Sequence, residues 1–465
     1  MNRTTSWKNN TLTKQTIIYA FGNFSSKLAS FLLIFFVTYF LDKSAVGEYD
    51  LIFNALSFLV PFISLQIGTS VFRWLLEDSK TENLNLIVGN TFFLLFVNYT
   101  IYSIVFWSLN FYYHFSWALY IYLISILQTF HSIIQQILRA TAKTFAFVLS
   151  GIATSLLTVL FAVVNLCYFK MTLEGILLAH LFSLLIVSLV LSKIINLHTF
   201  ISFNISRSLL KSMLKYSLPL LPNNFSWWLI TSSTRFIILY FLGVDKNGLF
   251  AIAYKFPSIV LMVGDVFYMA WQEKVIMESL DVKSNSLALE KYIRFLFTSI
   301  ILVSCISKVA IAYLAQESFS QAWKYTPILL YATLVQSVVA FYGAAYLSRK
   351  DTRGVIGSSV IGAVVTISIS VLGTKSLGLY GTSMAILLGF IVVLIIRIRQ
   401  TKEYFPVIFP YKLWIQFTIV FILVSVANYI DNIVIFTLSL IVSIILFFTY
   451  NKDIFFQLKS EGLKV

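Results

Sequence analysis

The dominant feature of this sequence is a succession of apolar segments, each long enough to cross a lipid bilayer as a helix. A transmembrane helix needs about 20 apolar residues, and the hydropathy of the 465 residues predicts about fourteen such helices. The predicted spans are 16–41, 47–72, 85–109, 116–138, 145–168, 173–192, 216–242, 247–272, 290–313, 325–347, 355–374, 378–398, 411–430 and 433–450. The loops between them are short, so we predict an all-α polytopic membrane protein.

The composition excludes most other classes of protein. Hydrophobic residues make up 59% of the chain and charged residues only 11%, against roughly 25% charged residues in an average soluble domain. A soluble enzyme, a secreted scaffold or a disordered chain cannot bury so much apolar surface. The polar and basic start is followed directly by a full-length span, which argues against a cleavable signal peptide.

The basic residues predict the orientation. If both termini are cytoplasmic, about 25 of the 34 Lys and Arg residues fall in inside segments and about six in outside loops. This asymmetry is the positive-inside pattern, and it supports the helix count. The net charge of +15 is then explained by topology and by attraction to anionic membrane lipid, and we expect no nucleic-acid partner.

The sequence also resembles itself at an offset of about 200 residues. The matches include Asn-Phe-Ser at 23–25 and 224–226, Tyr-Phe-Leu at 39–41 and 240–242, and Gly47 with Gly248. Six helices separate each pair, so the two halves enter from the same side and form a parallel pseudo-two-fold repeat, which is typical of alternating-access transporters. We predict an N-terminal lobe at 1–200, a C-terminal lobe at 201–405, and a helix pair with a cytoplasmic tail at 406–465.

Three cations lie deep within predicted spans, well away from the span ends, where a charge costs several kcal/mol and rarely faces lipid. They are Lys27 in the first helix, Arg235 in the seventh and Lys255 in the eighth. Because Asp265 is the one deep candidate counter-ion, these cations indicate a cavity for an anionic ligand. Arginine suits phosphate, since its fork binds two oxygens at once. Internal pairing, or snorkelling of the side chains to the interface, is the alternative.

Other polar residues within spans are candidates for cavity or coupling roles: Asn23, Asn54, Asn224 and Asp265. The chain has no Walker loop, HExxH motif or GxSxG motif, so we expect no catalysis and no ATP hydrolysis. Two distant cysteines and four scattered histidines give no metal-ligand spacing. We therefore expect no metal and no cofactor.

Several segments together resemble a known family. They include TIIYAFGNFSSKLASFLLIFFVTYFLDKSAVGEYDL near the start, YSLPLLPNNFSWWLITSSTRFIILYFLGVDKNGLFAIAYKFPSI in the middle, and GAAYLSRKDTRGVIGSSVIGAVV and LGLYGTSMA further on. In this order and spacing, over about 14–405, the chain resembles the polysaccharide-export (Wzx-type flippase) branch of the multidrug/oligosaccharidyl-lipid/polysaccharide (MOP) transporter superfamily.

The resemblance implies a flippase of the bacterial cytoplasmic membrane. It would move undecaprenyl-diphosphate-linked oligosaccharide units outward by alternating access, for capsule, exopolysaccharide or other surface polysaccharide. A polysaccharide polymerase and chain-length proteins are implied partners. In related flippases, cations on the first and eighth helices contact the diphosphate. Lys27 and Lys255 stand on those helices here, and Arg235 is the candidate on the seventh. The last two helices form a lipid groove in such relatives.

Three alternatives stay open at this point. A teichoic-acid or lipid II precursor flippase would differ only in its cargo. A multidrug exporter of the same superfamily would be expected to carry acidic cation sites in its cavity, whereas cations outnumber carboxylates in these spans. A membrane-embedded polymerase or ligase would need a large outer loop, and the predicted outer loops are only a few residues long.

Overall fold

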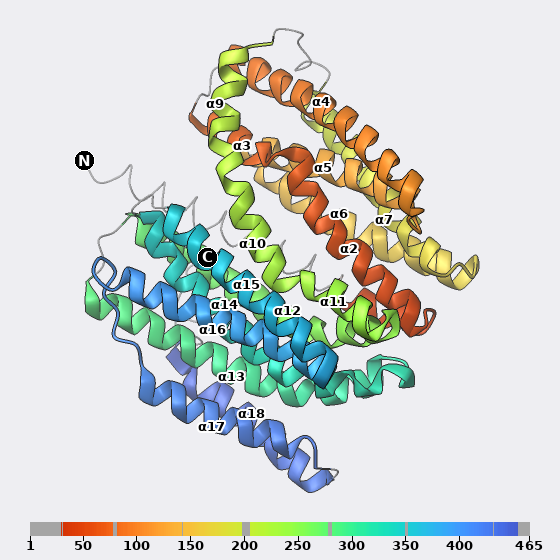
Figure 1. Cartoon of the computed structure of the whole chain (residues 1–465). Coiled ribbons are helices and arrows are strands. Elements are labelled where there is room, and N and C mark those ends of the chain that lie inside the picture. Colours follow the sequence, from red (N-terminus) through yellow and green to blue (C-terminus); the bar gives the residue numbers. More distant parts are fainter. Residues whose placement is uncertain are drawn as a thin grey trace. The chain divides into compact units, whose positions relative to one another are not determined.

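The computed structural model describes residue 29 and residues 31–77, 81–141, 143–197, 205–277, 281–348, 352–430 and 432–453. Within these ranges every regular element is a helix (Figure 1). The α-helices are α2 (Lys43–Ser64), α3 (Ile67–Glu77), α4 (Thr81–Tyr113), α5 (Ala118–Ala140), α6 (Thr144–Val163), α7 (Leu173–Ile194), α9 (Arg207–Ser217), α10 (Leu221–Thr231), α11 (Ser233–Leu242), α12 (Val244–Met277), α13 (Val282–Leu314), α14 (Thr326–Ser348), α15 (Thr352–Leu377), α16 (Leu379–Thr401), α17 (Tyr411–Ala427) and α18 (Ile433–Tyr450).

The described residues contain 12 helical segments long and apolar enough to cross a membrane. They coincide with twelve of the predicted spans, from 47–72 to 378–398 together with 433–450. The thirteenth, α17, is a shorter apolar helix of 17 residues. Most of the first predicted span, 16–41, lies outside the described residues. The prediction of an all-α, multi-pass membrane protein is thus confirmed.

The chain packs into two compact units. The first comprises residues up to Leu33 and Tyr49–Trp228, and the second comprises Ile34–Glu48 and the chain from Leu229 onward. The short segment Ile34–Glu48 therefore packs with the second unit, although the chain before it and after it belongs to the first unit. These units are defined by packing, and the lobe boundaries at 200 and 405 stay predictions.

The first unit has a core of branched aliphatic side chains from α3, α4, α5 and α7. Ile67, Ile134 and Leu138 are among its fully buried members. α7 packs against both α5 and α6. Its inward stripe includes the small residues Gly175 and Ala179, and small residues let membrane helices approach closely.

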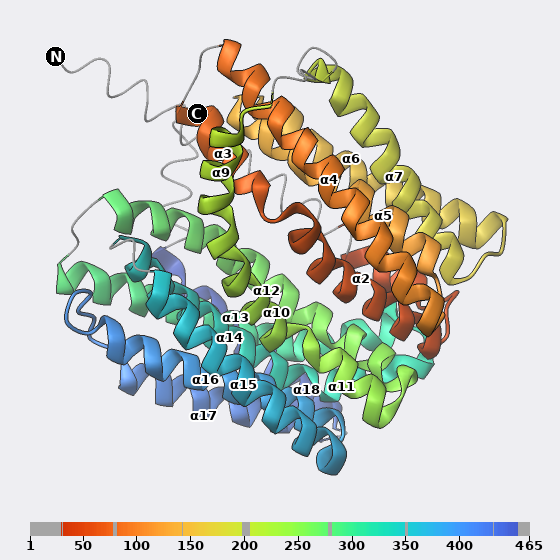
Figure 2. The same cartoon turned by 45° about the horizontal axis from the view of Figure 1, so that its top comes forward.

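The second unit is built around α14. This helix packs on α12, α13 and α16. Most residues of its membrane-spanning part, Thr326–Tyr346, are buried inside the protein. α13 contacts α14 and also the α17–α18 pair, which Figure 2 shows from a second direction. α15 and α16 form a tight hairpin. A Cβ on Gly381 would lie 1.9 Å from the carbonyl oxygen of Gly373, so this crossing requires glycine.

Two spans that hydropathy predicts as continuous are broken. The second span is interrupted between α2 and α3, where Leu65 and Gln66 have positive φ angles of 48° and 55°. Pro61 lies one turn earlier within α2. The seventh span contains a 3-10 turn at Leu218–Leu220 and a second break at Ser232. A hydropathy profile detects the length of an apolar segment, and it does not detect breaks in the helical backbone.

Candidate functional site

Arg235 lies in the second break of the seventh span, near the start of α11. Its side chain is 2% exposed. Nη1 donates to the carbonyl of Thr231 and to Thr234 Oγ1. The guanidinium carbon lies 4.2 Å from the ring centroid of Tyr254 and 4.9 Å from that of Phe250. Aromatic faces and a carbonyl both stabilise a cation, so the break gives a buried charge a defined place.

Lys255 follows Tyr254 directly on α12, and its side chain is half-buried. The Ser258 hydroxyl donates to the Lys255 carbonyl, and Pro257 stands between them. α11 and α12 thus meet where Arg235 contacts Tyr254, one residue before Lys255. Arg235 and Lys255 both belong to the second unit. Their role in binding a ligand stays a prediction.

The other predicted site residues are dispersed. Asp265 is exposed on α12, ten residues and about 15 Å along the helix axis from Lys255. Lys27 and Asn23 lie outside the described residues. Asn54 is half-buried on α2, where its Nδ2 donates to the Asp50 carbonyl.

Asn224 has an exposed side chain on α10. It lies in the first unit, as Asn54 does. The two helices meet where the indole Nε1 of Trp228 donates to the Asn54 carbonyl over 2.9 Å. The two asparagines thus belong to the first unit, and Arg235 and Lys255 belong to the second.

Arg397 is a buried cation that the sequence reasoning missed, because its place near a helix end suggested a cytoplasmic side chain. It is 1% exposed in α16. Its Nη1 donates to the Val339 carbonyl at 2.9 Å, and Nε and Nη2 donate to the hydroxyls of Ser358 and Ser359 at 3.2 and 3.1 Å. It therefore joins α14, α15 and α16.

One signal in the sequence could have identified Arg397. The buried positions of α16 include Phe390, Val393, Leu394, Arg397 and Thr401. They follow the three- and four-residue spacing of a single helix face. The arginine therefore occupies a position in the buried stripe.

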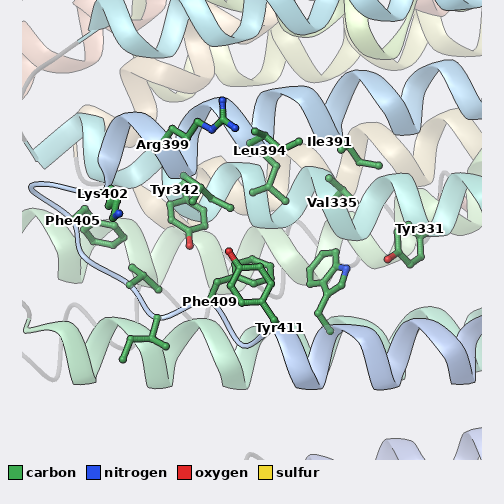
Figure 3. A pocket seen from close by; sticks show the side chains of 15 residues that line it. Tyr331, Val335, Tyr342, Ile391, Leu394, Arg399, Lys402, Phe405, Phe409 and Tyr411 are labelled. Atoms are coloured by element: carbon green, nitrogen blue, oxygen red, sulfur yellow. The ribbon is translucent and has the colours of Figure 1, made fainter.

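A cavity of about 930 Å³ opens in the second unit between α14, α16, the linker after α16, and α17. Its walls are mostly apolar, with Arg399 and Lys402 at the end of α16. Figure 3 shows Tyr342 and Tyr411 approaching the cavity from opposite walls, and Lys402 beside Phe405 at one end. The arrangement can hold an apolar chain that carries an anionic group.

Comparison with known proteins agrees with this architecture. The model of a family described as polysaccharide biosynthesis protein matches residues 12–271. The lipid II flippase MurJ, in an inward closed conformation, aligns with a TM-score of 0.71 at 13% identity, over 95% of this chain and 99% of that one. No curated protein matches.

Two other solved structures show the same fold. An inward-facing multidrug resistance MATE family transporter of the MOP superfamily gives a TM-score of 0.67 at 13% identity, over 82% of this chain and 94% of that one. A MOP superfamily transporter from Pyrococcus furiosus gives 0.59 at 14% identity, over 84% and 95%.

Proposed function

The chain belongs to the polysaccharide biosynthesis protein family of the MOP superfamily, and we propose that it is a flippase for undecaprenyl-diphosphate-linked oligosaccharide. It moves this cargo from the inner to the outer leaflet of the bacterial cytoplasmic membrane for assembly of a surface polysaccharide. The two lobes, 1–200 and 201–405, move so that the binding site of the cargo opens to one side of the membrane at a time. It acts as a transporter and not as an enzyme.

The observation that carries the proposal is the pair of cations on α11 and α12. Arg235 is held in the membrane-spanning part of the chain against Tyr254, the residue that precedes Lys255. Keeping cations within spans is costly, and such residues mark substrate pathways. A diphosphate offers oxygens for the arginine fork and for the lysine ammonium. Lys27 is the third proposed contact.

The chemistry of the cargo explains why a protein is needed. A sugar chain in hydrocarbon would leave many hydroxyl groups without hydrogen-bond partners, and each costs several kcal/mol. A hydrated path removes this cost for the sugars, while cations compensate the diphosphate. The polyprenyl tail loses nothing by staying in an apolar environment.

We propose that the cavity beside α17 receives this tail. Its lining is mostly apolar, and its volume of about 930 Å³ lies near the upper end of the range of small-molecule pockets, which is about 300–1,000 Å³. Arg399 and Lys402 at the end of α16 favour an amphiphile with an anionic end. The appended helix pair α17–α18 then handles the lipid part of the cargo.

Charge reversal in cells tests the function. Lys255→Glu is expected to abolish export of the surface polysaccharide while membrane abundance is retained, because a carboxylate at this half-buried position repels the diphosphate. Arg235→Lys keeps the buried charge but loses the fork that binds two oxygens, and is expected to reduce export. Lys246→Glu is the matched control, since Lys246 is exposed near the start of the same α12. Wild-type levels of surface polymer in the Arg235 and Lys255 variants would contradict a diphosphate role.

A further inference from the structure

Four aromatic rings form a continuous wall where α2 meets α10 in the first unit. We call Phe58, Phe62, Phe225 and Trp228 the aromatic wall. The ring centroids of Phe58 lie 4.9 Å from Trp228 and 5.6 Å from Phe225. Phe62 lies 4.5 Å from Phe58 and 6.0 Å from Phe225. Each ring therefore contacts at least two others.

The wall is rigid at its centre. The indole N–H of Trp228 donates to the Asn54 carbonyl over 2.9 Å, which fixes the orientation of this ring. Phe225 lies one helical turn earlier, and its ring is nearly parallel to that of Trp228, at an angle of 10°. An aromatic surface held in this way loses little conformational entropy when a ligand stacks on it.

Two rings of the aromatic wall are exposed, and polar side chains lie on the same two helices. Phe62 is 38% exposed and Phe225 is 36% exposed. The side chains of Ser57 and Asn224, on the same two helices, are also exposed. An amide facing hydrocarbon would lose its hydrogen bonds at a cost of several kcal/mol. The Ser57 hydroxyl donates to the Asn54 carbonyl of its own helix, so the open rings beside the exposed Asn224 amide are what fits a hydrated path better than a lipid-facing surface.

This mixture matches the chemistry of a pyranose ring. A sugar presents an apolar face of C–H groups and a rim of hydroxyls. The C–H face is attracted by the negative face of an aromatic ring, and the hydroxyls pair with amide and hydroxyl groups, which both donate and accept hydrogen bonds.

We propose that Phe62 and Phe225, with Asn224, form a stacking site for a sugar of the cargo. This proposal rests on the proposed function and deepens it. The proposal adds groups that recognise the carbohydrate to the cations proposed for the diphosphate. The Asn-Phe-Ser motif of the repeat thereby gains a role in its second copy.

The first experiment measures whether the site faces water or lipid. Asn224→Cys is made in a background where Cys167 and Cys305 are replaced by serine, and is treated in liposomes with a charged, water-soluble thiol reagent. Phe96→Cys is the control, since Phe96 is 69% exposed on the strongly apolar α4. We expect the cysteine at 224 to react and the cysteine at 96 to stay unmodified. Equal resistance of both cysteines would overturn the proposal.

The second experiment separates sugar binding from diphosphate binding. Affinity is measured for undecaprenyl diphosphate and for the same lipid carrying a pyranose disaccharide. Phe62→Leu and Phe225→Leu keep an apolar side chain, and are expected to weaken binding of the glycosylated probe about three- to tenfold. Binding of the bare diphosphate is expected to stay unchanged, and Phe96→Leu is expected to change neither affinity.

The two probes also distinguish this proposal from the function beneath it. If both probes bind and the leucine variants leave their affinity ratio unchanged, the stacking site is wrong and the flippase stands. If the leucine variants weaken the binding of both probes by the same factor, the protein has lost stability in general, and this result would also contradict a specific sugar contact. If neither probe binds the wild-type protein, the proposed function and the stacking site fall together.

Discussion

Gly47 and Gly248 contact each other backbone to backbone at the crossing of the first turns of α2 and α12. A Cβ on Gly47 would lie 2.2 Å from the carbonyl oxygen of Val244, and a Cβ on Gly248 would lie 2.1 Å from that of Lys43. The sequence repeat pairs these same residues, Gly47 with Gly248 and Lys43 with Val244. The crossing therefore has two matching halves, and both glycines are required by close approach.

The first prediction concerns this crossing. Gly47→Ala and Gly248→Ala are each expected to destabilise the protein by about 1–3 kcal/mol, the usual cost of overpacking, because the new methyl group meets a carbonyl oxygen. Thermal unfolding of the purified protein measures the effect. Gly357→Ala in α15 is the control, since nothing lies within 4 Å of a Cβ built there. Equal melting temperatures for all three variants would contradict the close approach.

A second prediction concerns Arg397. Arg397→Lys keeps the charge but cannot reach the Val339 carbonyl and the hydroxyls of Ser358 and Ser359 together. We expect a loss of about 1–3 kcal/mol, the cost of leaving buried polar groups without partners. Arg399→Lys, at an exposed position two residues later, is expected to change stability by less than about 0.5 kcal/mol. The melting temperatures of the two variants give the comparison.

A third prediction concerns the cavity beside α17. Val335→Trp and Ile391→Trp place an indole in the space proposed for the polyprenyl tail, and are expected to reduce photocrosslinking of an undecaprenyl-diphosphate probe whose reactive group is in the tail. Ile445→Trp is the control, on the exposed side of α18. In the wild type we expect crosslinked peptides from α14, α16 or α17. Crosslinks that avoid these helices would contradict the assignment.

The positions of the helices were predictable from the sequence because apolar length is a local property. Each of the twelve candidate spans in the described residues has a counterpart in the hydropathy profile. The breaks at Leu65 and Ser232 were not predictable, since they depend on backbone geometry and not on apolarity. The Gly47–Gly248 match showed the repeat, but only the structure shows that the two residues touch.

The candidate site was predictable only in part. Arg235 and Lys255 stood out because charges are rare within spans, and the structure places them on adjacent helices. Arg397 and the aromatic wall were not predicted from the sequence, for two different reasons. Arg397 resembled an ordinary residue of a cytoplasmic helix end, while Phe58, Phe62, Phe225 and Trp228 are ordinary members of apolar spans. Their meaning comes from which helices pack together, and that is a long-range property.

Reconstitution tests the central claim most directly. The purified protein is placed in liposomes with a fluorescent undecaprenyl-diphosphate oligosaccharide, and the accessibility of the head group to an external quencher is followed with time. We expect protein-dependent equilibration of the head group between leaflets, lost in Arg235→Gln and Lys255→Gln and retained in Lys246→Gln. The same head-group distribution in liposomes with and without the protein, together with transport of cationic drugs by the same vesicles, would contradict the flippase and favour an exporter.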